Sequence, residues 1–246
     1  MEQNLIDYEA LKKRGFLKSR AAGEFALRTR MPAGNYNSTH LKIVSNIADT
    51  YGEGFVHMTV RQGIEIPHIK YADIDNVEFI VKQAGIQLGT SGSRLRATTS
   101  CPGNNWCKSG LINTFAFVDA LENEHGIICA MDLPHKFKIA VAGCPNLCTR
   151  GQSSEIGVFG QVDLKAQDAS KRIGYGVYIG GCGGKNPRQG IKLEKVFSQE
   201  DLFKVIEKVI EFYRKNAQPK QRLGETIEQF GKHKFLEVIG LELTGY

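Results

Sequence analysis

Hydrophobic and polar positions alternate with changing periods along the first part of the chain. Alternation with period two predicts strands at residues 24–31, 55–60, 64–66 and 94–99. Helical spacing predicts one helix that begins after Ser38 as its N-cap and ends near Gly52, and a second over residues 73–84. The order is therefore strand, helix, strand, strand, helix, strand.

This order predicts a ferredoxin-like split βαβ unit in the N-terminal half. Beyond it, the pattern predicts strands at residues 137–142, 156–160 and 174–180, and helices at residues 108–124, 198–216 and 223–230. The fold class expected is α+β. We expect a lead over residues 1–22, a ferredoxin-like half-domain over 23–92 and a second domain, of α/β type, over 93–246.

Composition narrows the classes of function. The chain has 246 residues and a net charge of +6, with no apolar run long enough to span a membrane. No export signal is visible, so we expect a cytoplasmic protein in which the six cysteines serve metal or redox chemistry rather than disulfides. The positive charge suits an anionic partner, and no nucleic-acid motif stands out.

Four of the cysteines form two pairs, Cys101-x5-Cys107 and Cys144-x3-Cys148. Cys101 and Cys144 each precede a proline, which fixes the backbone in a rigid turn. Three interpretations compete: buried inert cysteines, structural zinc and a [4Fe–4S] cluster. The clustering disfavours the first and the wide first pair disfavours zinc, so four thiolates for a cluster are the favoured interpretation.

The same stretch resembles the sulfite and nitrite reductases that couple a [4Fe–4S] cluster to sirohaem. The second pair has the family's form Gly-Cys-Pro-Asn-x-Cys. Three basic motifs match in the family's order: Leu27-Arg-Thr-Arg-Met-Pro32, Thr59-Val-Arg-Gln62 and Leu133-Pro-His-Lys-Phe-Lys138. The likeness runs from about Phe16 to about Gly231 and is greatest to the small, single-unit sulfite reductases.

The resemblance implies sirohaem and one [4Fe–4S] cluster held by Cys101, Cys107, Cys144 and Cys148, with Cys148 bridging cluster and haem. It assigns the substrate-binding cations to Arg30, Arg96, Lys136 and Lys138. Guanidinium and ammonium groups suit a small oxyanion, and crowded cations make a lysine a better acid. On the residues alone, Lys-Phe-Lys is also typical of a protected strand edge.

A larger set of polar residues is expected to hold the sirohaem carboxylates or to hydrogen-bond the cluster. Its members are Arg28, Thr59, Arg61, Gln62, Thr98, Asn104, Asn105, Asn146, Arg150 and Gly181. Gly181 belongs to a glycine-rich loop whose backbone N–H groups suit carboxylates, although a simple turn explains it equally well. The remaining Cys129 reads as core, Cys182 has no assigned role, and His135 reads as structural or surface.

Together these features predict a sulfite reductase that reduces sulfite to sulfide with six electrons from a separate donor, such as an acidic ferredoxin. A nitrite reductase of the same family and a non-catalytic electron-transfer subunit are the alternatives. The larger members of the family contain two such units, so this chain is expected to pair with a copy of itself as a homodimer or higher assembly. No nucleic acid or membrane is expected as a partner.

Overall fold

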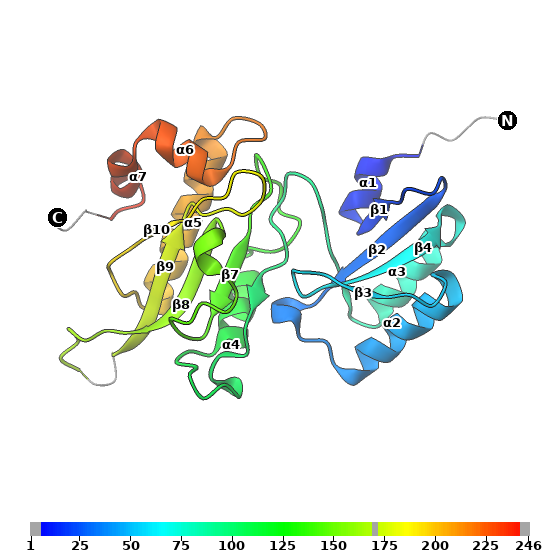
Figure 1. Ribbon diagram of the computed structural model, residues 1–246, viewed down its shortest axis with the longest axis horizontal. Helices are drawn as coiled ribbons and strands as arrows, with labels where there is room; N and C mark the ends of the chain where they lie inside the picture. The colour runs from blue at the N-terminus through cyan, green and yellow to red at the C-terminus, as the bar shows by residue number, and fades with distance from the viewer. Residues whose placement is uncertain (1–5, 169–171, 242–246) are drawn as a thin grey trace. The chain divides into compact units, whose positions relative to one another are not determined.

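The computed structural model describes residues 6–168 and 172–241, which fall into two compact units, Met1–Gly92 and Ser93–Tyr246. Each unit is built around its own β-sheet, with helices packed against it (Figure 1). Among the described residues, no helix has both the length and the apolar character needed to cross a membrane.

The first unit has a five-stranded antiparallel sheet in the order β1-β2-β4-β3, with β5 also paired to β2. Its elements in chain order are α1 (Tyr8–Lys13), β1 (Phe16–Lys18), β2 (Glu24–Arg30), α2 (Ser38–Tyr51), β3 (His57–Met58), β4 (Ile64–Lys70), α3 (Ile74–Gln83) and β5 (Gln87–Leu88). The run from β2 to β5 confirms the predicted ferredoxin-like order.

Several local predictions were wrong. The strand expected at residues 94–99 is not part of this sheet, because the chain turns at Gly85 and reaches β2 already at β5. The strand expected at residues 55–60 is shorter in the structure, where only β3 (His57–Met58) is a strand. The N-cap of α2 is Asn37, whose side chain accepts the backbone N–H of His40, rather than Ser38.

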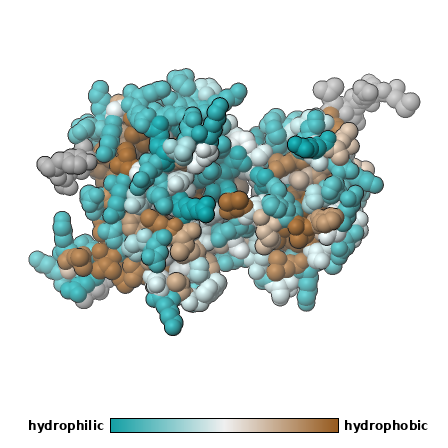
Figure 2. All heavy atoms as spheres, viewed as in Figure 1, coloured by the Kyte–Doolittle hydropathy of each residue, from teal (hydrophilic) through white to brown (hydrophobic). Residues whose placement is uncertain are grey.

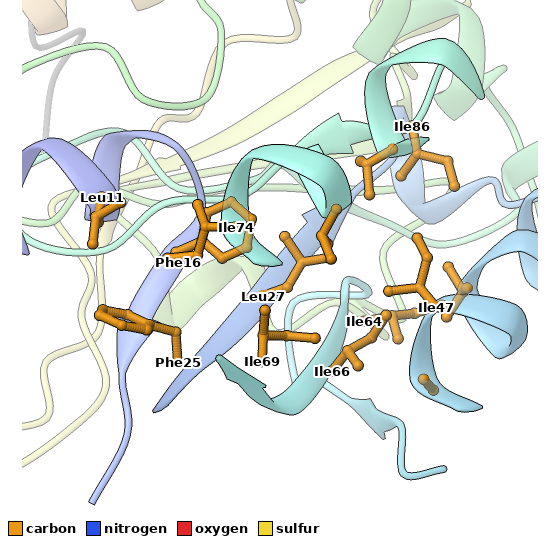
Figure 3. Close-up of a cluster of buried hydrophobic side chains, with 14 residues drawn as sticks. Leu11, Phe16, Phe25, Leu27, Ile47, Ile64, Ile66, Ile69, Ile74 and Ile86 are labelled. Atoms are coloured by element: carbon orange, nitrogen blue, oxygen red, sulfur yellow. The ribbon is translucent and has the colours of Figure 1, made fainter. Parts of the chain in front are cut away.

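The core of the first unit lies between its sheet and its helices (Figure 3). Ile64, Ile66 and Ile69 of β4 all point into it, although a strict alternation would turn Ile69 outward. A register shift between β2 and β4, with His68 in the left-handed region, returns Ile69 to the buried face. Leu11 and Phe16, from the segment expected to be only a lead, also belong to this core.

The second unit has a mixed sheet in the order β10-β9-β8-β7-β6, in which β6, β7 and β8 run parallel. Its elements are β6 (Thr99–Ser100), α4 (Thr114–Asp119), β7 (Ile139–Ala142), β8 (Ile156–Val162), β9 (Ile173–Ile179), β10 (Ile191–Lys192), α5 (Gln199–Asn216), α6 (Leu223–Phe230) and α7 (Lys232–Val238). The helix predicted at 108–124 is therefore shorter, and continues from Ala120 to Glu124 as a π-helical turn.

Strands β7 and β8 are the centre of this sheet. All four residues of β7 and the first five of β8 are buried, as expected for parallel strands covered on both faces. Aromatic contacts join the helices to this core, including Phe117 with Phe203 and Phe137 with Tyr213, whose ring centroids lie 4.8 Å and 5.5 Å apart. The predicted strand at 137–142 begins two residues later, at Ile139.

Each unit also exposes apolar side chains. In the first, the segment around the edge strand β3 exposes Phe55, Val56, Met58 and Val60 by 49–94%. In the second, Val162, Leu164 and Ile173 are exposed around the far end of the β8–β9 hairpin, where Figure 2 shows hydrophobic surface at the lower left. Apolar side chains gathered in this way mark surfaces available for contact with another molecule.

A buried carboxylate ties α1 to α3 in the first unit. Glu78 accepts a hydrogen bond from Arg14 Nε at 2.7 Å and pairs with Lys82 Nζ at 2.7 Å. Burial alone would raise the pKa of Glu78, but the hydrogen bonds from Lys82 and Arg14 outweigh it and hold the pKa below its ordinary value. A lowered pKa means that the ionised carboxylate stabilises the fold above pH ~4.5 and that this contribution is lost as the pH falls through the folded-state value.

We therefore predict that Glu78→Gln lowers the free energy of unfolding by about 1 kcal/mol at pH 7. The difference from the parent should shrink as the pH falls through the lowered folded-state pKa of Glu78, where the parent carboxyl becomes uncharged like the Gln amide. Urea denaturation at pH 7 and at a series of acidic pH values measures it. The control is Glu200→Gln, which removes only an exposed pair with Lys204; an equal loss in the control, or a loss that does not change with pH, would contradict the prediction.

Candidate active site

The sheet of the second unit brings the two cysteine pairs to one edge. Strands β6 and β7 are parallel neighbours, with Ser100 opposite Val141. Cys101 follows directly after β6, and Gly143 and Cys144 follow directly after β7. Because the carboxyl ends of parallel strands meet at the same edge of a sheet, both cysteine loops start side by side. The backbone N–H of Cys101 donates to Val141 O at 3.2 Å and that of Leu111 donates to Gly143 O at 2.8 Å, which ties the loops together.

Glycines allow the two loops to touch through their main chains. A Cβ added to Gly143 would lie 2.5 Å from the Cα of Gly103, inside the first cysteine loop. A Cβ added to Gly160 of β8 would lie 2.4 Å from Gly143 O. Only residues without a side chain permit these contacts. The second cysteine loop therefore lies directly on β8, pressed against the first loop.

The thiols themselves sit at different depths. Cys144 is buried, Cys101 is half-buried, and Cys107 and Cys148 are exposed. The backbone N–H of Gly143 donates to Cys101 Sγ at 3.0 Å. A hydrogen bond to sulfur stabilises the thiolate and is one of the ways a protein tunes an iron–sulfur cluster. Leu147 and Arg150, on either side of Cys148, both adopt the left-handed backbone conformation that turns this loop.

Three of the four expected cations lie together in the second unit. The backbone N–H of Arg96 donates to Phe137 O at 2.8 Å, so Arg96 lies across from the residue between Lys136 and Lys138. Phe137 is fully buried, while both lysines are partly exposed, as the predicted shared face of an extended segment requires. The pKa of His135 is lowered by burial and by the charges of Arg222, Lys136 and Arg96. Arg96 and Lys136 are therefore close enough to act on one group, and Lys138 follows on the same extended segment.

The first unit gathers the other expected residues at one end of its sheet. Arg30 is 3% exposed at the end of β2, next to the start of β4. The motif Thr59-Val-Arg-Gln62 is a turn, not the strand predicted, and Thr59 Oγ1 accepts the backbone N–H of Gly63 at 3.0 Å. Gln62 in turn packs on Gly34, which follows the basic motif of β2. Arg61 is half-buried in this turn.

Arg28 is already engaged within the first unit. Its Nε donates to Glu65 Oε1 at 2.7 Å, across the β2–β4 pair, and one Nη donates to Thr90 O at 3.1 Å. This arrangement supports the end of the sheet that carries Arg30. An additional role toward a haem stays a prediction.

The remaining expected residues surround the cysteine loops to different degrees. Thr98 is buried just before β6, whereas Asn104, Asn146 and Arg150 are exposed on the loops. The side chain of Asn105 donates to Pro102 O at 2.8 Å and to Asn113 Oδ1 at 3.3 Å, so it braces the first cysteine loop. Gly181 is buried against Gln152 O and Ser154 O, whereas a Cβ at Gly183 or Gly184 of the same loop would meet nothing within 4 Å, so only the start of the glycine-rich loop is packed.

Sequence reasoning missed three buried polar atoms that have no hydrogen-bond partner. Thr149 Oγ1 and Gln152 Oε1 lie in the segment that follows Cys148, and His135 Nδ1 lies next to Lys136. Buried polar atoms are normally satisfied, so unsatisfied ones point to a polar ligand. Thr149 follows Cys148 directly, which was the available signal. A hollow of about 570 Å³ also borders the second cysteine loop, lined by Cys144, Pro145, Asn146 and Lys192 among others, but by none of the candidate cations.

Paired cysteine loops, a cluster of cations and unsatisfied polar groups define the class: an iron–sulfur protein that binds an anionic cofactor or substrate. Comparison with known families agrees. The family described as "Nitrite and sulphite reductase 4Fe-4S domain" matches residues 91–245, and the one described as "Nitrite/Sulfite reductase ferredoxin-like half domain" matches residues 18–84. The chain belongs to the nitrite and sulfite reductase family.

The relatives of this chain include both sulfite reductases and nitrite reductases. The chain is 28% identical to a coenzyme F420-dependent sulfite reductase of Methanocaldococcus jannaschii, over 92% of this chain and 44% of that protein. It is 30% identical to a nitrite reductase [NAD(P)H] of Bacillus subtilis, over 85% of this chain and 24% of that protein. It thus spans less than half the length of either. The solved structure of a dissimilatory sulfite reductase shares its fold, with a TM-score of 0.79 at 19% identity.

The family's cofactors are sirohaem and a [4Fe–4S] cluster, and the residues of the second unit fit both. Four cysteines on two touching loops match the ligand number of the cluster. Thr149 Oγ1, which is buried next to Cys148 without a hydrogen-bond partner, can donate to a carboxylate of sirohaem. The assignment of each ligand to its residue remains our prediction.

We predict that Gly143→Ala removes most of the bound iron and acid-labile sulfide, because its Cβ would push the second cysteine loop away from Gly103. Gly183→Ala is the matched control, since a Cβ there meets nothing within 4 Å. Iron and sulfide analysis of anaerobically purified protein measures both. Full cluster content in Gly143→Ala would show that the close approach of the loops is dispensable.

Proposed function

We propose that this chain is a sulfite reductase that reduces sulfite to sulfide, with sulfite bound by Arg30, Arg96, Lys136 and Lys138. The observation that carries the proposal is the grouping of Arg96, Lys136 and Lys138 on the unit that also holds the four cysteines. An electron carrier has no need for an anion pocket, so the grouping disfavours a non-catalytic subunit. The reaction consumes six electrons and eight protons per sulfite and yields hydrogen sulfide and three waters.

In this proposal the cofactors, the arginines and the lysines have different roles. Sirohaem bound by this chain would supply an iron that can bind the anion, and a cluster held by the four cysteines would supply electrons. Arg30 and Arg96 provide guanidinium groups that can each hold two oxygens of the anion. Lys136 and Lys138 provide ammonium groups that offset its charge and release protons as oxygen leaves as water.

Nitrite is the second candidate substrate, because a nitrite reductase is among the relatives at comparable identity. Both anions suit the same cations. We favour sulfite because the relative covered over 92% of this chain is a sulfite reductase. Steady-state turnover of each anion with an artificial reductant distinguishes the two.

We predict that Lys136→Ala and Lys138→Ala each lower the rate of sulfite turnover by about 10²–10⁴-fold, the usual contribution of a positioned proton donor. The visible absorption of the bound cofactors should not change. Lys234→Ala, an exposed lysine on α7, is the control and should keep the parental rate. If both lysine variants keep the parental rate, the proposed role is wrong, and Lys136 and Lys138 only protect a strand edge.

We also propose a homodimer, or a higher assembly built from it, with electrons supplied by a separate acidic carrier that suits the net charge of +6. Lys138 and Cys144 flank opposite ends of β7, and six residues of extended strand span about 20 Å. This separation favours an arrangement in which the cations of one copy face the cofactors of the other. The apolar side chains exposed around β3, Phe55 to Val60, offer surface for such pairing.

A mixed-dimer experiment tests the shared site. We predict that a Cys148→Ala chain and a Lys136→Ala/Lys138→Ala chain, each inactive alone, recover activity when combined, because one intact site can then form across the two copies. Tagged purification confirms that mixed dimers are present. No recovery would mean that each chain builds its own site, and a fully active monomer in light scattering would exclude the assembly.

A further inference from the structure

Glu155 is a completely buried carboxylate to which neither the sequence pattern nor the proposed chemistry gives a role. It is 0% exposed and directly precedes β8. Oε2 accepts the backbone N–H of Lys138 at 2.8 Å, and Oε1 accepts Arg222 Nε at 2.7 Å. A second guanidinium N–H of Arg222 also donates to Oε1. A buried carboxylate is costly unless donors surround it in this way.

The contact with Lys138 holds that residue from both sides of its peptide backbone. Its N–H donates to the Glu155 side chain, and its carbonyl accepts the N–H of Ile156 at 3.1 Å. The neighbouring Phe137 is fully buried, so the segment is also anchored through its side chain. The main chain at Lys138 is thus fixed at the residue whose side chain carries the ammonium group.

Arg222 extends the same support to the residues before Lys138. It is the N-cap residue of α6, and its own N–H donates to Glu225 Oε2 at 2.9 Å. Two residues earlier, the N–H of Lys220 donates to Pro134 O at 3.1 Å. The segment 220–222 therefore contacts the Pro134–Lys138 stretch at its start, and through Glu155 at its end.

The charged groups that act on Glu155 are positive. Arg222 and Lys138 face it, His135 and Glu225 lie near Arg222, and the phenol of Tyr213 has its pKa raised by burial and then by Glu155. Burial raises the pKa of Glu155 itself, while Arg222 and Lys138 oppose that rise. Glu155 is thus the carboxylate that faces a cationic neighbourhood from inside the fold.

We propose that Glu155, held in place by Arg222, is a positioning residue for Lys138. By accepting the Lys138 N–H it fixes the backbone from which the ammonium group reaches the substrate anion. This inference rests on the proposed function for the rate it predicts, but the hydrogen bond and its effect on the backbone do not depend on it. Misplacing a catalytic group by about 1 Å can cost about 10²-fold in rate.

A pair of double variants separates positioning from stability. Glu155→Leu/Arg222→Met replaces both buried partners with apolar side chains, a change that is often tolerated, and removes the acceptor for the Lys138 N–H. Glu155→Gln/Arg222→Met keeps an oxygen that can accept it. Urea denaturation and cofactor absorption establish that both variants are folded and loaded. Removing Glu155 alone would leave Arg222 buried and unpaired, which confuses the two effects.

The first readout is independent of activity. Amide hydrogen exchange at Lys138 should accelerate in Glu155→Leu/Arg222→Met and remain slow in Glu155→Gln/Arg222→Met. The second is sulfite turnover, where kcat/KM should fall by about 10–100-fold in the Leu variant and stay within about threefold of the parent in the Gln variant. Unchanged exchange at Lys138 in the Leu variant, or equal turnover in the two variants, would overturn the proposal.

A cycle with Lys138→Ala distinguishes failure of this inference from failure of the proposed function. If Glu155 acts through Lys138, adding Glu155→Leu/Arg222→Met to Lys138→Ala should cost no further activity, whereas independent roles would give multiplying losses and reject the proposal. If Lys138→Ala alone keeps the parental rate, the proposed role of the lysine is wrong, and faster exchange in the Leu variant still identifies Glu155 as the residue that fixes the segment.

Discussion

The second unit depends on the contact between two main chains, that of Gly143 after β7 and that of Gly103 within the first cysteine loop. No side chain fits between them, because a Cβ on Gly143 would lie 2.5 Å from the Cα of Gly103. The parallel pairing of β6 with β7 sets the starting points of the loops, and this contact sets their separation. The two cysteine loops therefore meet, although their residues are far apart in the chain. A cluster bound there would in turn link the two loops covalently.

Strand β7 connects the candidate cations to the cysteines. Lys138 directly precedes it, and Cys144 lies two residues after its end. β7 is completely buried, so its two ends are the places where it meets polar groups. At its start, Glu155 and Ile156 hold the main chain of Lys138; at its end, Gly143 donates to Cys101 Sγ. Buried strands with every backbone group paired move little, which suits residues that must hold fixed positions. The same rigid element thus supports the candidate cations at one end and the cysteine loops at the other.

In the first unit, too, a buried core holds strands whose ends carry polar residues. Its isoleucine-rich core holds β2 and β4 together, and the polar motifs lie at the end where β2 stops and β4 begins. Arg28 forms an ion pair with Glu65 across the strands, while Arg30, one residue pair further, is buried at the sheet end. Adjacent arginines on one strand face therefore have different surroundings, which the two-residue spacing alone does not reveal.

The sequence by itself determined the family features: cysteine spacing, the basic motifs, and most helices and strands, since these depend on local pattern. α6 matches its predicted bounds because it carries a clear apolar stripe, whereas β3 is shorter than the predicted strand because residues 59–62 turn the chain into β4. Only the tertiary structure placed Arg96 beside Lys136 and Lys138, and only it revealed Glu155. A carboxylate before an apolar strand reads as a surface residue until Arg222, 67 residues away, is folded against it. Contacts of that range leave no periodic signal, because they depend on how the elements pack.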